Sequence, residues 1–229
     1  MNFPSVSHFI AFLSMRIVIL PLLVALLRWR WLQAPERIFA GLMAYRFAIA
    51  LVSAYLLEQH IPQNFLGAIS LAIDALAMGL MYGLMLDSAR LRFAVRWGGA
   101  VFAGLCLLNG WIGEGVDNGI SSVASGVECL LVAGLATVYC QQRMADARST
   151  SLRTDSLFLI NAGLLLISLT AFPLYFFVKP LLSYSRTLAL RTYDLMFLAG
   201  IAAKLLYTAG FWFSRRRSVA VGASAVSTI

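Results

Sequence analysis

Charged residues are scarce in this chain of 229 residues. Asp, Glu, Lys and Arg together make up 12% of it, whereas 61% of the residues are hydrophobic. Soluble domains carry roughly 25% charged residues, so this composition excludes a water-soluble protein and indicates an integral membrane protein. Acidic residues are fewer than basic residues, 10 against 18, which gives a formal net charge of +8. Without a soluble surface, that charge predicts a fixed topology and contact with anionic lipid rather than nucleic-acid binding.

Residues and motifs that build metal or catalytic sites are also few. The three cysteines, Cys106, Cys129 and Cys140, lack metal-ligand spacing, and the two histidines, His8 and His60, form no HxxxH pattern. The chain has no Gly-rich phosphate loop, no nucleophile elbow and no kinase-like motif. Nor does it show the inverted repeat that marks many transporters. We therefore expect no metal site and no enzyme, and a conventional transporter is disfavoured.

Long apolar runs occupy most of the chain. A transmembrane helix requires roughly 20 predominantly apolar residues. Seven stretches meet this requirement, at about 8–27, 38–57, 65–86, 95–113, 119–140, 156–178 and 192–213. The first follows no basic region and precedes no small-residue cleavage site, so we expect a retained helix rather than a signal peptide. In the third, Gly79 and Gly83 are four residues apart, which predicts close helix packing. Residues 1–229 are thus predicted to form one domain, an all-α bundle of seven transmembrane helices.

Basic residues gather at one set of predicted helix ends. Twelve arginines lie there: Arg28, Arg30, Arg37, Arg90, Arg92, Arg96, Arg143, Arg148, Arg153, Arg215, Arg216 and Arg217. The opposite ends carry only Lys179, Arg186 and Arg191. Because short cytoplasmic loops retain Lys and Arg, the N-terminus is expected outside and the C-terminus in the cytoplasm. This is the plan of a multi-pass protein of the bacterial inner membrane.

Five charged residues lie inside the predicted spans: Arg16, Arg46, Asp74, Glu128 and Lys204. A charge at the bilayer centre costs roughly 3 kcal/mol or more, so such residues tend to be functional. Counted from the outer helix ends they lie about 9 to 13 residues deep, which at 1.5 Å per residue is within about 6 Å of one depth. We expect a polar centre in which the two acids balance part of the positive charge.

Polar residues accompany two of these charges along the same helix faces. Ser121 and Ser125 share one stripe with Glu128, and Tyr207 shares a face with Lys204. Both stripes are suited to lining a cavity. The alternative is that the hydroxyl groups only join neighbouring helices by hydrogen bonds.

The placement of Lys204 resembles that of the retinal lysine in the microbial rhodopsin family. Asp74 lies in the third predicted helix, and Phe172, Pro173 and Phe176 are similar to part of that family's sixth-helix WxxYPxxW segment. The resemblance implies retinal bound to Lys204 as a protonated Schiff base. Asp74, helped by Glu128, would be the counterion, and the two phenylalanines and the proline would flank the polyene. The implied function is that of a photoreceptor or a light-driven ion-translocating protein.

Several positions depart from the rhodopsin pattern. Gly200 stands where the family has a carboxylate one turn before the lysine. Leu71 and Ala75 replace the Arg and Trp around the third-helix acid, and Met85 occupies the place of a proton-donor carboxylate. These departures favour a slow photoreceptor, or a pump of another kind, over an efficient outward proton pump.

The chain is also similar to uncharacterised bacterial seven-helix membrane proteins of the sensor type. The similarity rests on Asp74, Glu128, the segment NFL at 64–66, and Asp155 at the start of the sixth helix. It implies a retinal-free sensor or receptor, or a protein whose buried cations bind an anionic or zwitterionic small molecule. Both hypotheses stay open at the level of sequence. The lipid bilayer is the expected partner in either case. Self-association, or a signalling partner, is compatible with both hypotheses. Only a Schiff base requires the lysine amine itself, so Lys204→Arg would abolish retinal binding and partly spare an anion site.

Overall fold

The computed structural model describes residues 10, 13–14, 16–60, 64–112, 120–146 and 152–214. Within these ranges the chain is helical, without strands. The α-helices are α2 (Ile19–Leu27), α3 (Ala34–Glu58), α4 (Asn64–Met85), α5 (Ala89–Ile112), α6 (Ile120–Asp146), α7 (Ser156–Tyr184) and α8 (Arg186–Phe213). A short 3-10 helix, η2 (Leu152–Thr154), precedes α7.

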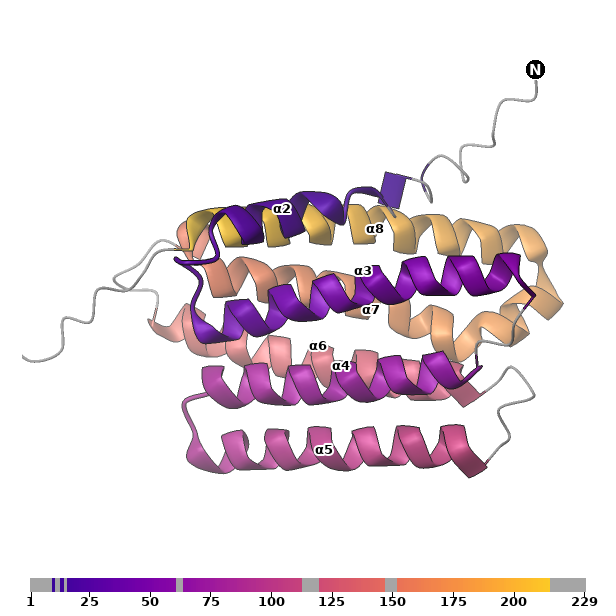
Figure 1. Ribbon diagram of the computed structural model, residues 1–229, viewed down its shortest axis with the longest axis horizontal. Coiled ribbons are helices and arrows are strands. Elements are labelled where there is room, and N and C mark those ends of the chain that lie inside the picture. Colours follow the sequence, from indigo (N-terminus) through magenta and orange to yellow (C-terminus); the bar gives the residue numbers. More distant parts are fainter. Residues whose placement is uncertain are drawn as a thin grey trace, which may run out of the picture.

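The helices run lengthwise through one bundle and alternate in direction (Figure 1). At one edge α5 packs against α4, and at the opposite edge α2 lies along α8, so the first and last described helices are neighbours. Helices α3, α4, α6 and α7 lie between these edges. We call the end where α2, α4, α6 and α8 finish the basic end, because the arginine-rich turns lie there.

Six helices in the part of the chain that the structure describes are long and apolar enough to cross a membrane. They are Ala34–Glu58, Leu66–Met85, Ala89–Asn109, Val123–Ala145, Ser156–Phe177 and Thr187–Phe213. Large apolar side chains on the outside of the bundle, such as Leu57, Phe93 and Leu195, are more than 60% exposed. Such a surface is suited to lipid and not to water. The chain is therefore a multi-pass helical membrane protein.

The first predicted span, 8–27, is wrong as a single continuous helix. Helical residues up to Arg16 are followed by a turn at Ile17 and Val18, and α2 begins only at Ile19. Pro21 explains the break. Its ring would clash with the carbonyl of Ile17, four residues earlier, and it has no N–H to donate, whereas the first turn of a new helix tolerates it. With nine residues, α2 alone is too short to cross a bilayer core of about 30 Å.

Each of the other six predicted spans coincides with a helix, but several helices extend beyond the predicted bounds. The helix predicted at 95–113 begins at Ala89, and the one predicted at 192–213 begins at Arg186. The extensions carry charged residues such as Arg90 and Arg92. A helix keeps its own hydrogen bonds in the interfacial region, so charge marks where the hydrocarbon core ends and not where the helix ends.

Glycines let α4 and α5 approach closely, as the sequence predicts for Gly79. A Cβ added to Gly99 would lie 2.8 Å from the carbonyl oxygen of Ala75, and one at Gly79 would lie 3.2 Å from that of Val95. At Gly83 the space is filled by Arg96, whose Nη2 donates to the Gly83 carbonyl at 2.8 Å. Small residues at such contacts are typical of membrane helix pairs.

At the basic end, Glu36 joins the last turn of α8 to the start of α3. Its Oε2 accepts hydrogen bonds from the backbone N–H of Gln33, at 2.6 Å, and from the hydroxyl of Ser214, at 2.5 Å. Arg28 adds a second link to Ser214 by donating to its carbonyl at 3.0 Å. Glu36 and Ser214 are both fully buried. The turn between α2 and α3 is thus fastened to the C-terminal end of α8.

Candidate functional site

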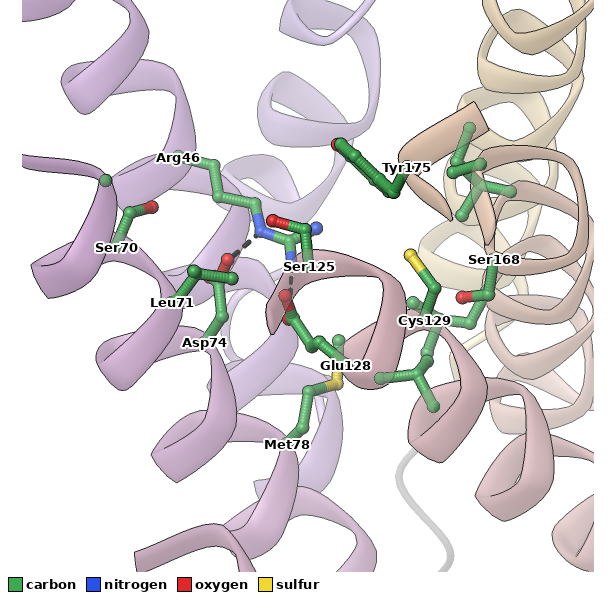
Figure 2. Close-up of a pocket in the computed structure, with 15 residues that line it drawn as sticks. Arg46, Ser70, Leu71, Asp74, Met78, Ser125, Glu128, Cys129, Ser168 and Tyr175 are labelled. Atoms are coloured by element: carbon green, nitrogen blue, oxygen red, sulfur yellow. Dashed lines mark hydrogen bonds and ion pairs between the residues drawn. The ribbon is translucent and has the colours of Figure 1, made fainter. Parts of the chain in front are cut away.

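Arg46 is the centre of an ion-pair cluster that joins three helices (Figure 2). Its Nε lies 3.0 Å from Oδ1 of Asp74, and its Nη2 lies 3.5 Å from Oε1 of Glu128. These side chains come from α3, α4 and α6, respectively. A guanidinium presents several N–H donors in a planar fork, so it can serve two carboxylates at once. The buried acids therefore find their positive partner in Arg46.

The cluster forms part of the wall of a cavity of about 480 Å³, the central cavity. Fifteen residues line it: Arg46, Gly67, Ser70, Leu71, Asp74, Met78, Ser125, Glu128, Cys129, Val132, Leu164, Ile167, Ser168, Ala171 and Tyr175. Although Arg46 lies inside the bundle, its side chain is 43% accessible, against 9% for Asp74 and 14% for Glu128. Arg46 is thus the most accessible of the three charged side chains that line the cavity.

The lining suits a small polar solute. Arginine is always charged, so the cavity holds one fixed positive charge opposite two carboxylates. The hydroxyl groups of Ser70, Ser125 and Ser168 can donate or accept hydrogen bonds. The ring of Tyr175 adds a face that attracts cations. With both acids ionised, the charge balance of the cavity is one negative charge.

Lys204 does not line the central cavity. Its Nζ donates to the carbonyl oxygen of Ser14 at 2.5 Å and to the Ser14 hydroxyl at 3.3 Å. It therefore joins α8 to the helical residues before the break at Ile17, while Asp74 is engaged by Arg46. Arg16 is exposed and does not line the central cavity either. The charged layer expected from the sequence thus divides, and its three members on α3, α4 and α6 are the ones brought together.

The expected polyene-flanking residues lie on other faces of α7. The rings of Phe172 and Phe176 are 5.0 Å apart, and the Phe176 ring covers Gly126 on α6, where an added Cβ would lie 2.3 Å from it. Pro173 is exposed. None of the three lines the central cavity, whereas their neighbour Tyr175 does.

Sequence reasoning missed a polar stripe on α7. Asn161, Ser168 and Tyr175 are spaced seven residues apart, which places them on one helix face. Two of them line the central cavity. The third, Asn161, is fully buried, and its Oδ1 accepts a hydrogen bond of 2.7 Å from the hydroxyl of Tyr82. The spacing within an otherwise apolar run was the signal that would have found them.

The remaining expected residues have other surroundings. Ser125 lines the central cavity beside Glu128, while the side chain of Ser121 and residue His8 lie outside the described part of the chain. Tyr207 packs edge-on against Phe39, with ring centroids 4.8 Å apart.

Comparison of the chain with protein-family models, with curated proteins and with solved structures finds no match.

Proposed function

We propose that this chain is a retinal-free membrane receptor that binds a small solute carrying a positively charged group, an amine or a zwitterion, in the central cavity. Asp74 and Glu128 would bind the ammonium group, and Arg46 would hold both acids in place. The observation that carries the proposal is that two carboxylates share a single guanidinium on the wall of a 480 Å³ cavity.

The charge balance selects the sign of the ligand. When both carboxylates are ionised, they and the one arginine leave one negative charge, which a bound cation would neutralise and a bound anion would increase. In an interior of low dielectric constant such a difference is worth far more than in water. A zwitterion could also place its own carboxylate on the N–H groups of Arg46 that face the cavity.

The sequence favours an anionic ligand only if three cations, Arg16, Arg46 and Lys204, face two acids. Of those cations only Arg46 lines the central cavity. The amine of Lys204 is bonded to Ser14, and Arg16 is exposed on the segment before α2. With two cations removed from the count, the preferred ligand charge changes from negative to positive.

For the topology we propose seven spans, with the helical residues before Ile17 and α2 together forming the first, interrupted span. The N-terminus would be outside and the basic end in the cytoplasm. Two observations support this: the arginine-rich turns lie together at one end of the bundle, and α2 packs along α8. Short cytoplasmic loops favour such an excess of arginine.

The binding proposal is tested with the purified protein and a panel of small amines matched to carboxylates of similar size, such as choline against butyrate. We expect amines to raise the midpoint of thermal unfolding and the carboxylates to leave it unchanged. Glu128→Gln should remove the effect, whereas Glu58→Gln, at the exposed end of α3, should preserve it. Stabilisation by carboxylates alone would show that the assigned sign is wrong.

The retinal hypothesis predicts colour, and we expect none. Two contacts weigh against a Schiff base at Lys204: its amine donates to Ser14, and the expected counterion Asp74 is paired with Arg46. Protein incubated with all-trans-retinal should therefore show no visible absorption band beyond that of free retinal. A visible band that disappears in Lys204→Ala would instead establish retinal binding and overturn the proposal.

A further inference from the structure

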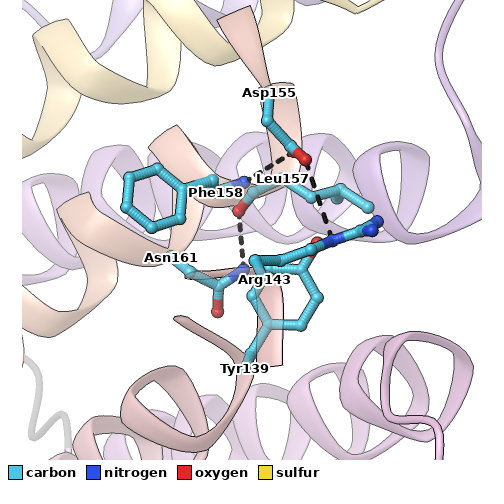
Figure 3. Close-up of polar contacts among 6 residues, drawn as sticks. All are labelled: Tyr139, Arg143, Asp155, Leu157, Phe158 and Asn161. Carbon is cyan, nitrogen blue, oxygen red and sulfur yellow. Dashed lines mark hydrogen bonds and ion pairs between the residues drawn. The ribbon is translucent and has the colours of Figure 1, made fainter. Parts of the chain in front are cut away.

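A second charged cavity, the inner cavity, lies at the basic end of the bundle. It measures about 340 Å³, and Asp87, Tyr139, Gln142 and Arg143 are among its lining residues. Arg143 donates from Nε to the Tyr139 hydroxyl at 2.8 Å and lies 3.7 Å from Oδ2 of Asp155 (Figure 3). The inner cavity and its border thus combine one arginine with two carboxylates, as the central cavity does.

The two cavities lie along the same helices. Each of α4, α6 and α7 lines both, and on each helix the facing residues are seven apart: Met78 and Met85, Val132 and Tyr139, Leu164 and Leu157. Seven residues are two helical turns, so these pairs share a face and are about 10 Å apart. The cavities are therefore aligned, with one short layer of protein between them.

That layer is closed by fully buried side chains. Tyr82, Ala136, Ile160 and Asn161 all have 0% exposure. Across it, the Tyr82 hydroxyl of α4 donates to Asn161 Oδ1 of α7 at 2.7 Å. Within α7, Asn161 Nδ2 donates to the Leu157 carbonyl at 2.7 Å. A buried polar pair is costly unless hydrogen-bonded, and an apolar pair would close the layer at less risk.

The polar stripe of α7 continues through this layer. Tyr175 and Ser168 line the central cavity, and Asn161 lies in the closed layer on the same helix face. Fourteen residues of helix span about 21 Å, so polar groups follow one line for most of the bilayer core. The polar stripe thus leads from the central cavity into the closed layer.

We infer that the two cavities are the ends of one translocation path for a small cation, and that the Tyr82–Asn161 layer is its gate. The inference rests on the proposed ligand sign and adds transport to binding. In this structure the gate is closed. Opening requires the loss of one hydrogen bond and rotation of the Tyr82 side chain, after which a cation can move from Asp74 and Glu128 towards Asp87.

Cys129 provides a reporter, because it lines the central cavity. With Cys106→Ala and Cys140→Ser it becomes the single cysteine of the chain. The probe is 2-(trimethylammonium)ethyl methanethiosulfonate, a membrane-impermeant cation, applied to membrane vesicles of either orientation. To reach Cys129 from the cytoplasmic side, this cation must pass the layer of Tyr82 and Asn161. The matched anionic probe is the sulfonatoethyl reagent.

We expect the cation to modify Cys129 quickly from outside and slowly, but measurably, from the cytoplasmic side. Tyr82→Phe alone removes the hydrogen bond and leaves the polar Asn161 without its partner, and Asn161→Ala alone removes the bond and opens space in the layer. Each should raise the cytoplasmic rate about tenfold, a factor that one buried hydrogen bond can supply. Tyr184→Phe and Asn109→Ala, both at exposed positions, are the matched controls and should leave it unchanged.

Three results would overturn the inference: no cytoplasmic modification in any variant, equal cytoplasmic rates in gate and control variants, or no modification from outside. The anionic probe separates this inference from the proposed function. If gate variants admit both probes equally well, the gate is supported and the assigned ligand sign is wrong. If amines bind but Cys129 is never reached from the cytoplasm, the protein is a receptor without transport.

Discussion

Position 46 shows what an arginine can do in a membrane that a lysine cannot. Two carboxylates on different helices lie within 3.5 Å of its guanidinium nitrogens. A lysine ammonium is a compact point charge on a flexible stem and lacks the planar fork that reaches both acids in fixed directions. The side chain therefore fixes α4 and α6 relative to α3 while remaining open to the cavity.

Arg46→Gln should lower the free energy of unfolding by about 1 to 2 kcal/mol, because it leaves two buried carboxylates without a cation; the accessibility of Arg46 keeps the cost below that of a fully buried pair. Arg46→Lys should lose less. Unfolding of the purified protein in detergent measures both. The control is Arg37→Gln, an exposed arginine near Trp29. An unchanged unfolding curve for Arg46→Gln would show that the ion-pair cluster does not stabilise the protein.

Asp74→Ala should destabilise the protein more than Asp74→Asn. The amide keeps the size of the carboxylate and an oxygen that can accept from Arg46 Nε, whereas alanine leaves that donor unpaired and opens space beside it. We expect a difference of about 1 kcal/mol, measured as above. Equal losses would mean that only the negative charge of Asp74 matters.

Arg46, Asp74 and Glu128 could be identified from the sequence as candidate site residues, because a charge within the lipid core is energetically costly. This cost does not identify their partners. Residue counting gives the depth of a side chain along its helix but neither the rotation of the helix nor its neighbours. Lys204 was therefore paired with Asp74 although its amine reaches Ser14. Asn161 is neutral, so the cost of burying a charge does not single it out. Its seven-residue spacing to Ser168 becomes informative only when this face of α7 is known to be buried.

Among the described helices, α5 packs mainly against α4. It packs on α4 through Gly99 and Ala103, while Phe93, Trp97 and Val101 are exposed. Without a hydrophobic driving force between helices in lipid, such a pair depends on close backbone approach. The fit at Gly99 should therefore decide whether α5 stays in place.

Gly99→Ala should weaken the α4–α5 pair by about 1 to 3 kcal/mol, since its Cβ would meet the Ala75 carbonyl at 2.8 Å. Gly98→Ala is the matched control, because nothing lies within 4 Å of its added Cβ. That change should be neutral, or stabilising by up to about 1 kcal/mol through helix propensity. Thermal unfolding of the two variants measures the contrast, and equal effects would refute the close-packing argument.

At the scale of helices, apolar length predicted six described helices to within a few residues at most ends and failed at the first. Apolarity does not distinguish a continuous span from one interrupted by a proline. Pro21 itself was the available signal, because a helix cannot continue unbroken from Ile17 through it. Helix ends were placed too early or too late wherever charged residues continue a helix beyond the apolar core.

The whole molecule should lie in the membrane with the basic end in the cytoplasm. A C-terminal fusion to alkaline phosphatase is expected to be inactive, and a C-terminal green fluorescent protein to fluoresce, because only the former requires the periplasm. A phosphatase fused after residue 60, at the opposite end of the bundle, should be active. The reverse pattern would invert the topology, and the inner cavity would then lie on the outer side of the membrane.

The contact between α2 and α8 determines when the bundle can close during synthesis. Most helix pairs are neighbours in the chain, but Arg28 and Ser214 are 186 residues apart. At 5 to 20 residues per second, a ribosome needs roughly 10 to 40 s to cover that distance. During this interval the nine-residue α2 has neither its final packing partner nor the length to span the bilayer alone. Of the described helices, α2 is thus the one that waits longest for its packing partner, because that partner is the last helix to be synthesised.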